Sequence, residues 1–249
     1  MIFILKQCLK NKKCRSKTYI IGDIHGAYLP LEDLLTKGNV NKKDDKIIFI
    51  GDLADGLPDF DKCLELLLSF ENFIPIIGNH DFFLMEFLKY GTINEEWIPS
   101  GGATTIEKLN NPNIISNLKT YFSKAEYYHT HDNKIFLHGG FNPKRAIDSQ
   151  RRRKFALNRK LYILAKTYHQ QKRKIPVSFK DTGIVIDEIF IGHSTTRNFK
   201  PDFVSNLINV DTGIKCGGKL TMMDIDTKQY IQSKNTEYYY KRILEPPLK

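Results

Sequence analysis

Cysteine is scarce in this sequence, and the spacings that build disulfide frameworks or zinc knuckles are missing. The four cysteines, Cys8, Cys14, Cys63 and Cys216, contain no C-x-x-C pair. No apolar run approaches the length of a membrane-spanning helix, and Met1–Leu5 is far shorter than the hydrophobic region of a signal peptide. These absences predict a protein of the reducing cytoplasm with no membrane partner.

A linker is also missing from the 249 residues, of which 41% are hydrophobic. A chain of this length can bury one large core, so we expect a single domain over residues 18–249. Residues 1–17 are rich in lysine and arginine, and we expect them to form a flexible basic lead-in before the first strand.

Acidic residues are outnumbered, because 28 Asp and Glu oppose 38 Lys and Arg, which gives a formal net charge of +10. This excess favours anionic partners such as phosphoesters, phosphoproteins or nucleic acid. A solvated, lysine-rich surface explains the same excess equally well. Charge alone therefore identifies no partner.

Three apolar runs in the first third of the chain each stop at a glycine that is followed by a polar residue. They are Tyr19-Ile-Ile-Gly-Asp23, Ile47-Ile-Phe-Ile-Gly-Asp52 and Pro75-Ile-Ile-Gly-Asn79. Such short runs, rich in β-branched residues, are typical of buried strands. We expect Asp23, Asp52 and Asn79 to lie at the carboxyl ends of strands, where open α/β sheets form ligand sites.

Amphipathic stretches between and after these runs predict helices. Pro30–Leu35 and Asp61–Phe70 separate the three strands, so the chain begins with parallel crossovers. Three further helices are expected over Asp81–Tyr90, Thr104–Leu109 and Asn113–Lys124. Short apolar runs then predict strands at Ala125–Tyr128, Lys134–Leu137, Ile189–Ile191, Leu207–Val210, Leu220–Ile225 and Gln229–Ile231. We therefore predict an α/β (α+β) fold.

Two of the later runs end in histidine, so five strand ends in total carry oxygen or nitrogen ligands. Carboxylate, amide and imidazole groups suit first-row divalent ions such as manganese, iron or zinc. Two ions about 3.5–4 Å apart can lower the pKa of a bridging water and favour its in-line attack on phosphorus. The predicted ligands are Asp23, His25, Asp52, Asn79, His138 and His193.

A leaving alkoxide also needs a proton, and His80, next to Asn79 in sequence, is the candidate general acid. A carboxylate on the far ring nitrogen would fix the tautomer of His80, and Asp55 is the candidate for that role. Taken singly, each of these residues has an ordinary explanation as a turn, cap or core residue. Their joint order along the chain is what favours a catalytic site.

Three blocks resemble the signature motifs of the calcineurin-like metallophosphoesterases. They are Gly22-Asp-Ile-His-Gly26, Gly51-Asp-Leu-Ala-Asp55 and Gly78-Asn-His-Asp81. Later stretches around His138, His193 and Asp211 are similar to the bacterial serine/threonine protein phosphatases, a branch related to the symmetrical diadenosine tetraphosphatases. The resemblance runs from about Tyr19 to Ile231.

This resemblance implies a β-sandwich of two mixed sheets flanked by helices, with two metal ions. His80 would be the acid, and Asp55 would lie behind it. The implied ligands are Asp23, His25 and Asp52 for one ion, and Asp52, Asn79, His138 and His193 for the other.

One position departs from the family pattern. The family's second block continues Asp-Arg-Gly, whereas Asp55 is followed here by Gly56 and Leu57. The arginine that clamps phosphate is therefore absent, and no glycine can replace its bidentate fork. Either another cation reaches the phosphate or affinity is weaker. Arg173, upstream of His193, is our candidate; the substrate-binding residues are otherwise unknown.

The segment of residues 144–174 is dense in lysine and arginine, and Asp148 is its only acid. Leu157, Leu161 and Leu164 mark an amphipathic helix within it. We expect a basic helical insertion here. It serves either as a groove that attracts a phosphorylated substrate or as a solvated surface.

Together these observations predict a two-metal phosphoesterase, with phosphomonoesters on serine or threonine side chains as the favoured substrate. The first alternative is a dinucleoside polyphosphate hydrolase of the diadenosine tetraphosphate type. The second is a basic binding protein on a degenerate phosphatase scaffold, which the complete set of ligands disfavours. We do not expect nucleic acid to be a partner.

Overall fold

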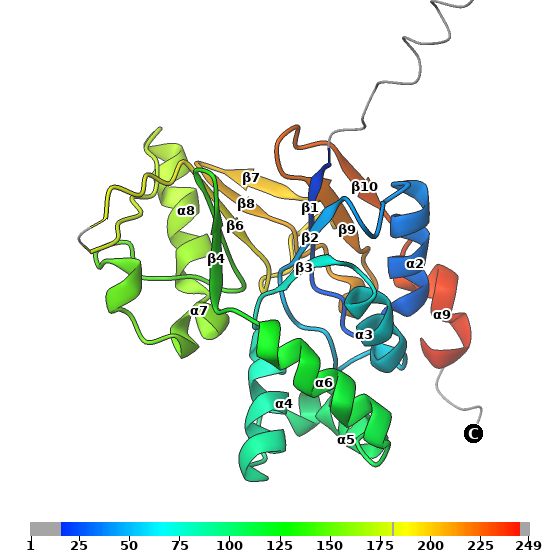
Figure 1. The fold of residues 1–249 in the computed structure, drawn as a ribbon. Coiled ribbons are helices and arrows are strands. Elements are labelled where there is room, and N and C mark those ends of the chain that lie inside the picture. The colour runs from blue at the N-terminus through cyan, green and yellow to red at the C-terminus, as the bar shows by residue number, and fades with distance from the viewer. Residues whose placement is uncertain (1–15, 181, 245–249) are drawn as a thin grey trace, which may run out of the picture.

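Two mixed sheets form the centre of the computed structural model, which describes residues 16–180 and 182–244 (Figure 1). The first sheet has the order β10-β9-β1-β2-β3. β1, β2 and β3 are parallel, and β9 is antiparallel to both of its neighbours. The strands are Thr18–Ile21 (β1), Lys46–Phe49 (β2), Asn72–Pro75 (β3), Thr221–Asp224 (β9) and Tyr230–Gln232 (β10).

The second sheet has the order β4-β5-β6-β8-β7. β5, β6 and β8 are parallel, while β4 and β7 are antiparallel edge strands. The strands are Tyr128–His131 (β4), Lys134–Leu137 (β5), Glu188–Ile191 (β6), Asp202–Val204 (β7) and Leu207–Asn209 (β8).

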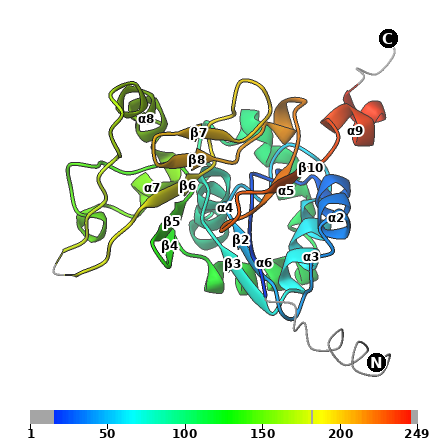
Figure 2. The same ribbon diagram turned by 90° about the horizontal axis from the view of Figure 1, so that it is seen from above.

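The sheets pack face to face because successive strand residues point to opposite sides and both sides are apolar. In β1, Ile20 belongs to the cluster between the sheets, whereas Tyr19 and Ile21 belong to the cluster under the helices. Phe136 of β5 and Phe190 of β6 fill the same inner layer, with ring centroids 4.9 Å apart. Figure 2 shows the two sheets between outer helices, which confirms the predicted β-sandwich.

The outer side of the first sheet is covered by helices whose buried residues join one large apolar cluster. These are the helices that the sequence predicts, and their ends differ from the predicted ends by a few residues. They are Tyr28–Lys37 (α2), Phe60–Leu68 (α3), Asn79–Tyr90 (α4), Ala103–Lys108 (α5) and Pro112–Lys124 (α6). At the end of the described chain, α9 (Thr236–Leu244) lies against α2.

The outer side of the second sheet is covered by α7 (Arg153–Leu157) and α8 (Lys160–Gln170). The sequence predicted one amphipathic helix here, and the structure divides it in two. Asn158 leaves the helical conformation, and its side-chain oxygen accepts the backbone N–H of Lys160 at 2.8 Å. An asparagine side chain that bonds the backbone two residues on forms a turn that competes with the helix, so α7 ends here.

Two predicted strands are misplaced, and one strand and one α-helix were not predicted. The apolar run that begins at Pro75 follows β3, which spans Asn72–Pro75, rather than forming it. We expected a strand over Ala125–Tyr128, but β4 begins at Tyr128, and Glu126 forms only an isolated bridge with Ile76. β4 is an edge strand whose residues are all half-buried, and its polar sequence lacks the apolar run that predicts a strand. The short strand β7 and the polar helix α9 were also missed, because neither has an apolar run.

The predicted lead-in falls almost entirely on residues 1–15, which lie outside the described residues. The division into a lead-in over 1–17 and one domain over 18–249 therefore stays a prediction. Among the helices of the described residues, none has both the length and the hydrophobicity that a membrane crossing requires.

Candidate metal centre and active site

The six predicted metal ligands meet at one edge of the sandwich, beyond the carboxyl ends of parallel strands from both sheets. This is where ligand sites form in open α/β sheets. The residues are Asp23 and His25 after β1, Asp52 after β2, Asn79 after β3, His138 after β5 and His193 after β6.

Asp52 lies at the centre of these side chains. Its Oδ2 is 3.2 Å from Nε2 of His138 and 3.6 Å from Nε2 of His25. Its Oδ1 accepts the backbone N–H of His80 at 3.0 Å, which holds the carboxylate in place. One oxygen of Asp52 is thus fixed by the backbone, and the other faces the imidazoles.

Backbone carbonyls orient the two imidazoles that face Asp52. Nδ1 of His25 lies 3.1 Å from the carbonyl of Ala54, and Nδ1 of His138 lies 2.8 Å from the carbonyl of Ile50. A histidine that donates Nδ1–H to a carbonyl keeps its Nε2 lone pair free for a metal ion.

Two groups of ligand-type atoms share Asp52. Atoms of His25, Asp52 and His80 lie within 4.8 Å of one another, and so do atoms of Asp52, His138 and His193. A carboxylate common to two such groups is the geometry that a bridging ligand between paired ions requires.

Asp23 and Asn79 lie beside these groups. Oδ2 of Asp23 accepts the backbone N–H of His193 at 3.0 Å, and the amide oxygen of Asn79 is 3.1 Å from Nε2 of His138. Within residues 16–180 and 182–244, Oδ1 of Asp23 and Nδ1 of His193 are buried without a hydrogen-bond partner. Buried polar atoms are seldom left so. Bound divalent ions would satisfy them, and the oxygen and nitrogen donors fit first-row metals.

Burial and neighbouring charge shift the pKa values of these groups in opposite directions. Burial alone would raise the pKa of Asp52, but His138 beside it holds that pKa well below its usual range. Burial would lower the pKa of His138, and Asp52 and Asp23 raise it instead to about 10, so a metal ion at its Nε2 would displace a proton. Burial raises the pKa of Asp23. It lowers the pKa of His25 to about 3 and that of His193 to about 2, so both are neutral, the form that binds metal.

Several residues at this edge have the positive φ angles of the left-handed region, which residues other than glycine rarely adopt. The φ angles are 49° at His25, 61° at Asp52, 70° at Asp55 and 67° at His193. Such residues cost roughly 1–3 kcal/mol each and persist where the surroundings impose them. Their concentration around Asp52 marks this edge as a functional site.

Two glycines make room for the carboxylates. A Cβ on Gly78 would lie 2.1 Å from Oδ1 of Asp52, and a Cβ on Gly192 would lie 2.2 Å from Oδ1 of Asp23. No side chain fits at such distances. The glycines of the sequence blocks are therefore needed for space as much as for the turn.

The predicted acid and its orienting carboxylate are in contact. Asp55 is buried, and it accepts hydrogen bonds from the ring of His80 and from two further side chains, Trp97 and Thr105. The ring of His80 also packs edge-on against that of His25, with centroids 4.9 Å apart. His80 is therefore held at the rim of the ligand cluster.

A comparison with models of protein families identifies the family of this chain. Residues 16–212, most of the chain, match the family model described as calcineurin-like phosphoesterase. The chain belongs to this family. Its members use divalent metal ions, and the cluster around Asp52 is a candidate group of ligands for such ions.

Curated relatives in this phosphoesterase family are named as dinucleoside tetraphosphatases. An asymmetrical bis(5'-nucleosyl)-tetraphosphatase from Oceanobacillus iheyensis is 27% identical and aligns with 86% of this chain and 91% of its own length. Symmetrical bis(5'-nucleosyl)-tetraphosphatases from Coxiella burnetii and Legionella pneumophila are 37% and 42% identical. These matches cover only 27% and 32% of the symmetrical enzymes' lengths.

Solved structures of other phosphoesterases share the fold. A candidate diadenosine tetraphosphatase superimposes with a TM-score of 0.66 at 19% identity, covering 88% of this chain and 94% of that one. A cold-active protein-tyrosine phosphatase from a Shewanella species gives a TM-score of 0.54 at 15% identity, covering 87% and 77%. At such identities the likeness concerns the fold alone.

The prediction that Arg173 binds the phosphate is wrong. Arg173 stacks on Tyr168 at 5.3 Å, beyond the end of α8. Arg159 precedes the same helix, and it donates to the carbonyl of His193 and to Oγ of Ser194. The helix between them is about 16 Å long, so Arg159 rather than Arg173 lies at the end next to His193. Sequence order within a basic segment could not show which end of the helix faces the site.

Asp81 is a site residue that sequence reasoning left without a role. Its buried carboxylate accepts backbone N–H groups from Asp52 at 2.7 Å, Leu53 at 3.0 Å and Gly78 at 2.9 Å. It therefore fixes the loops after β2 and β3 relative to each other. Its place at the end of the third sequence block was the available clue.

Lys215 is a second residue whose position the sequence did not reveal. Its Nζ donates to the carbonyl of Ser100 at 2.7 Å and lies 3.5 Å from Nε2 of His80. Burial lowers the pKa of the ammonium, and the negative charge of Asp52 opposes that shift. A cation is thus present beside the predicted acid.

Proposed function

We propose that this phosphoesterase hydrolyses dinucleoside polyphosphates of the diadenosine tetraphosphate type. The relative that aligns along nearly its whole length is named for this activity, and a candidate enzyme of the same kind shares the fold. The sequence alone favoured phosphoproteins. The names of the relatives support the alternative substrate instead.

The observation that carries this proposal is a cavity with basic walls next to the ligand cluster. Its volume is about 690 Å³, and it follows α7 and the start of α8. A polyphosphate presents a row of negative charges, which several cations complement better than they complement one phosphate. The cations that line the cavity are Arg151, Arg153, Lys154, Arg159 and Lys160.

The cavity is joined to two predicted metal ligands of the second sheet. Arg159 donates to the backbone of His193, as described above. Gly139, which follows His138, donates its N–H to the carbonyl of Phe155 in α7 at 2.7 Å. The segment that lines the cavity is therefore bonded to the loops that carry His138 and His193.

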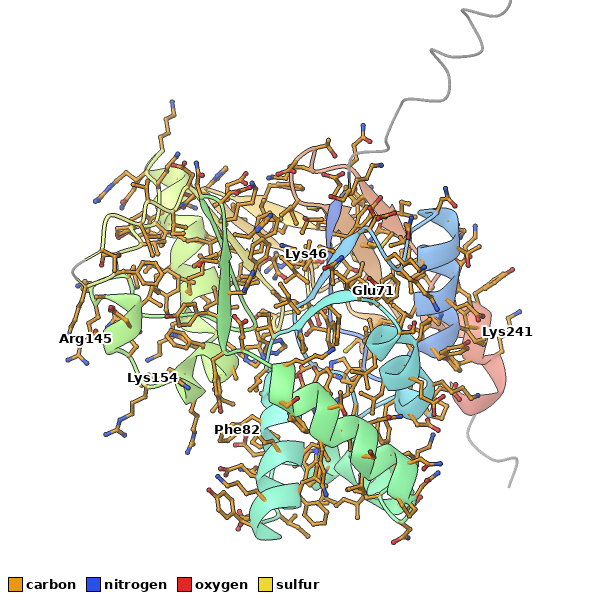
Figure 3. All side chains as sticks on the ribbon, viewed as in Figure 1. Lys46, Glu71, Phe82, Arg145, Lys154 and Lys241 are labelled. Carbon is orange, nitrogen blue, oxygen red and sulfur yellow. The ribbon has the colours of Figure 1, made fainter. Side chains whose placement is uncertain are left out.

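Arg153, which lines the cavity, also contacts α4, the helix that begins with Asn79. The guanidinium of Arg153 lies 5.8 Å from the ring centroid of Phe82. Figure 3 labels Phe82 on the side of α4 that is nearest to α7, and Lys154 on α7 itself. A substrate whose reacting phosphate lies at the ligands would extend its remaining phosphates along these cations.

The predicted ligands would hold two divalent ions that share Asp52. Bound there, the ions would activate water and polarise a phosphoryl oxygen. His80 donates a proton to the departing oxygen, and Asp55 keeps the Nδ1 side of the ring protonated and oriented. These ligand and catalytic assignments are predictions that the contacts described above support.

Incubation with diadenosine tetraphosphate and Mn²⁺, followed by ion-exchange chromatography of the nucleotides, tests the proposal. Water adds to one phosphorus as one P–O–P bond breaks. We expect AMP and ATP in equal amounts, because the relative aligned along nearly its whole length is the asymmetrical one. ADP as the sole product would support the same substrate class with symmetrical cleavage.

Two outcomes would contradict the proposal. Rapid release of phosphate from a phosphoserine peptide without turnover of the dinucleotide would favour a protein phosphatase. Binding of polyanions without hydrolysis of either substrate, in protein that contains metal, would favour a basic binding protein.

A further inference from the structure

The side chain of Lys215 fills the space into which a side chain at position 56 would extend. A Cβ on Gly56 would lie 3.1 Å from Cγ, 3.3 Å from Cδ and 3.4 Å from Cε of Lys215. The aliphatic part of Lys215 therefore covers Gly56, and a long side chain at position 56 would displace it. Position 56 is where the second block of the family has its arginine, so the lysine occupies the room that this arginine would need.

The ammonium of Lys215 and the imidazole of His80 converge on one point. Their nitrogen atoms are 3.5 Å apart. An ammonium carries three N–H donors, and the carbonyl of Ser100 takes one of them. The ammonium can therefore donate a charge-assisted hydrogen bond to an anionic oxygen beside His80.

Lys215 is anchored to the same segment that orients the predicted acid. Ser100, which accepts its hydrogen bond, lies three residues after Trp97. The indole of Trp97 donates to Asp55, and Asp55 holds the ring of His80. The cation and the acid are therefore fixed to one support before any substrate arrives, which lowers the cost of binding.

We propose that Lys215 binds the phosphoryl group under attack and takes the place of the arginine that Gly56 lacks. This inference rests on the proposed function, because it concerns the substrate of the same site. Lysine is a point charge without the planar fork of arginine. The phosphate is consequently held by several groups around the site, of which Lys215 is the one beside the leaving oxygen.

Three variants test the inference with Mn²⁺-loaded protein. Lys215→Met keeps the length and removes the charge, Lys215→Arg keeps the charge, and Lys124→Met removes an exposed charge from the end of α6. The measurements are KM and kcat for diadenosine tetraphosphate, the Ki of inorganic phosphate against p-nitrophenyl phosphate, the Tm, and the metal content.

We expect Lys215→Met to raise KM and the phosphate Ki by about 10- to 100-fold, with a smaller effect on kcat and unchanged metal content. Lys215→Arg should keep most of the affinity, and Lys124→Met should behave as the wild type. Unchanged KM and Ki in a folded Lys215→Met protein would overturn the inference.

Different measurements test the inference about Lys215 and the proposed function, so either can be refuted without the other. A wild-type protein that does not hydrolyse diadenosine tetraphosphate would refute the substrate class. The Ki of inorganic phosphate, measured with p-nitrophenyl phosphate, would still decide whether Lys215 binds phosphate. An equal Ki for the wild type and Lys215→Met would overturn the inference even if the dinucleotide is the substrate.

Discussion

Nδ1 of His80 lies 2.7 Å from Oδ2 of Asp55, and this contact turns the other ring nitrogen toward the predicted substrate. Asp55 also accepts hydrogen bonds from the indole of Trp97 and the hydroxyl of Thr105, each at 2.5 Å. Three donors around one buried carboxylate hold it rigidly. The orientation of His80 is therefore set by residues that are buried behind its ring.

If His80 protonates the leaving oxygen, its replacement should matter most when the leaving group is poor. We expect His80→Ala to lower kcat/KM by about 10²- to 10⁴-fold for phenyl phosphate and much less for p-nitrophenyl phosphate. Steady-state kinetics with both esters, at equal metal content, measures the difference. An equal loss for both esters would refute the general-acid role.

Thr105→Val removes one of the three donors to Asp55 without changing the size of the side chain. We expect the free energy of unfolding to fall by about 1–3 kcal/mol, because a buried carboxylate loses a hydrogen bond. Thr104→Val is the matched control, since Thr104 is exposed and bonds only to the carbonyl of Gly101 among the described residues. Urea denaturation of both variants gives the comparison, and equal stabilities would contradict the role of Thr105.

Asp81→Asn should damage the site through the backbone. An amide replaces one carboxylate oxygen with a donor, so either the N–H of Leu53 or those of Asp52 and Gly78 lose their acceptor. We expect a loss of about 2 kcal/mol or more in the free energy of unfolding, together with weaker metal binding because Asp52 is displaced. Urea denaturation and elemental analysis measure the two effects. Wild-type values for both would show that Asp81 has no such role.

Divalent ions should stabilise the folded chain, because they satisfy the buried atoms of Asp23 and His193 and relieve repulsion among buried carboxylates. At 100 times the dissociation constant, the gain is about 2.7 kcal/mol. For a chain of this size that corresponds to a Tm increase of about 5–10 °C. Calorimetry with and without Mn²⁺ measures it. Asp52→Asn should lose most of the increase, and a full increase in this variant would contradict the bridging role.

Neutralising the basic cavity should affect long substrates selectively. For Arg151→Gln combined with Lys154→Gln, we expect a higher KM for diadenosine tetraphosphate, a shallower salt dependence and little change for p-nitrophenyl phosphate. The matched control is Lys172→Gln combined with Arg173→Gln, which removes the same charge beyond the far end of α8. If both pairs behave alike, the cavity is an ordinary charged surface.

The sequence predicts the parts of this molecule whose local pattern is strong. Apolar runs of β-branched residues that stop at glycine predicted β1 and β2, and placed Asp23 and Asp52 at their carboxyl ends. The sandwich followed from the resemblance to the family. The edge strand β4 was misplaced because half-buried polar residues such as His129 and His131 give no apolar alternation.

The contacts that complete the site could not be predicted, because they join positions far apart in the chain. Asp81 bonds to residues 28 and 29 positions before it, and Lys215 reaches Ser100 across 115 positions. Arg159 was indistinguishable in sequence from the other cations of its segment. Only the break at Asn158, which separates α7 from α8, turns Arg159 toward His193.

Anomalous diffraction from crystals grown with Mn²⁺ tests the central claim most directly. The account predicts two manganese peaks about 3.5–4 Å apart, one on each side of the Asp52 carboxylate. One peak would lie among Asp23, His25 and Asp52, and the other among Asp52, Asn79, His138 and His193. A map from active protein with no peak within coordination distance of Asp52 would contradict the account.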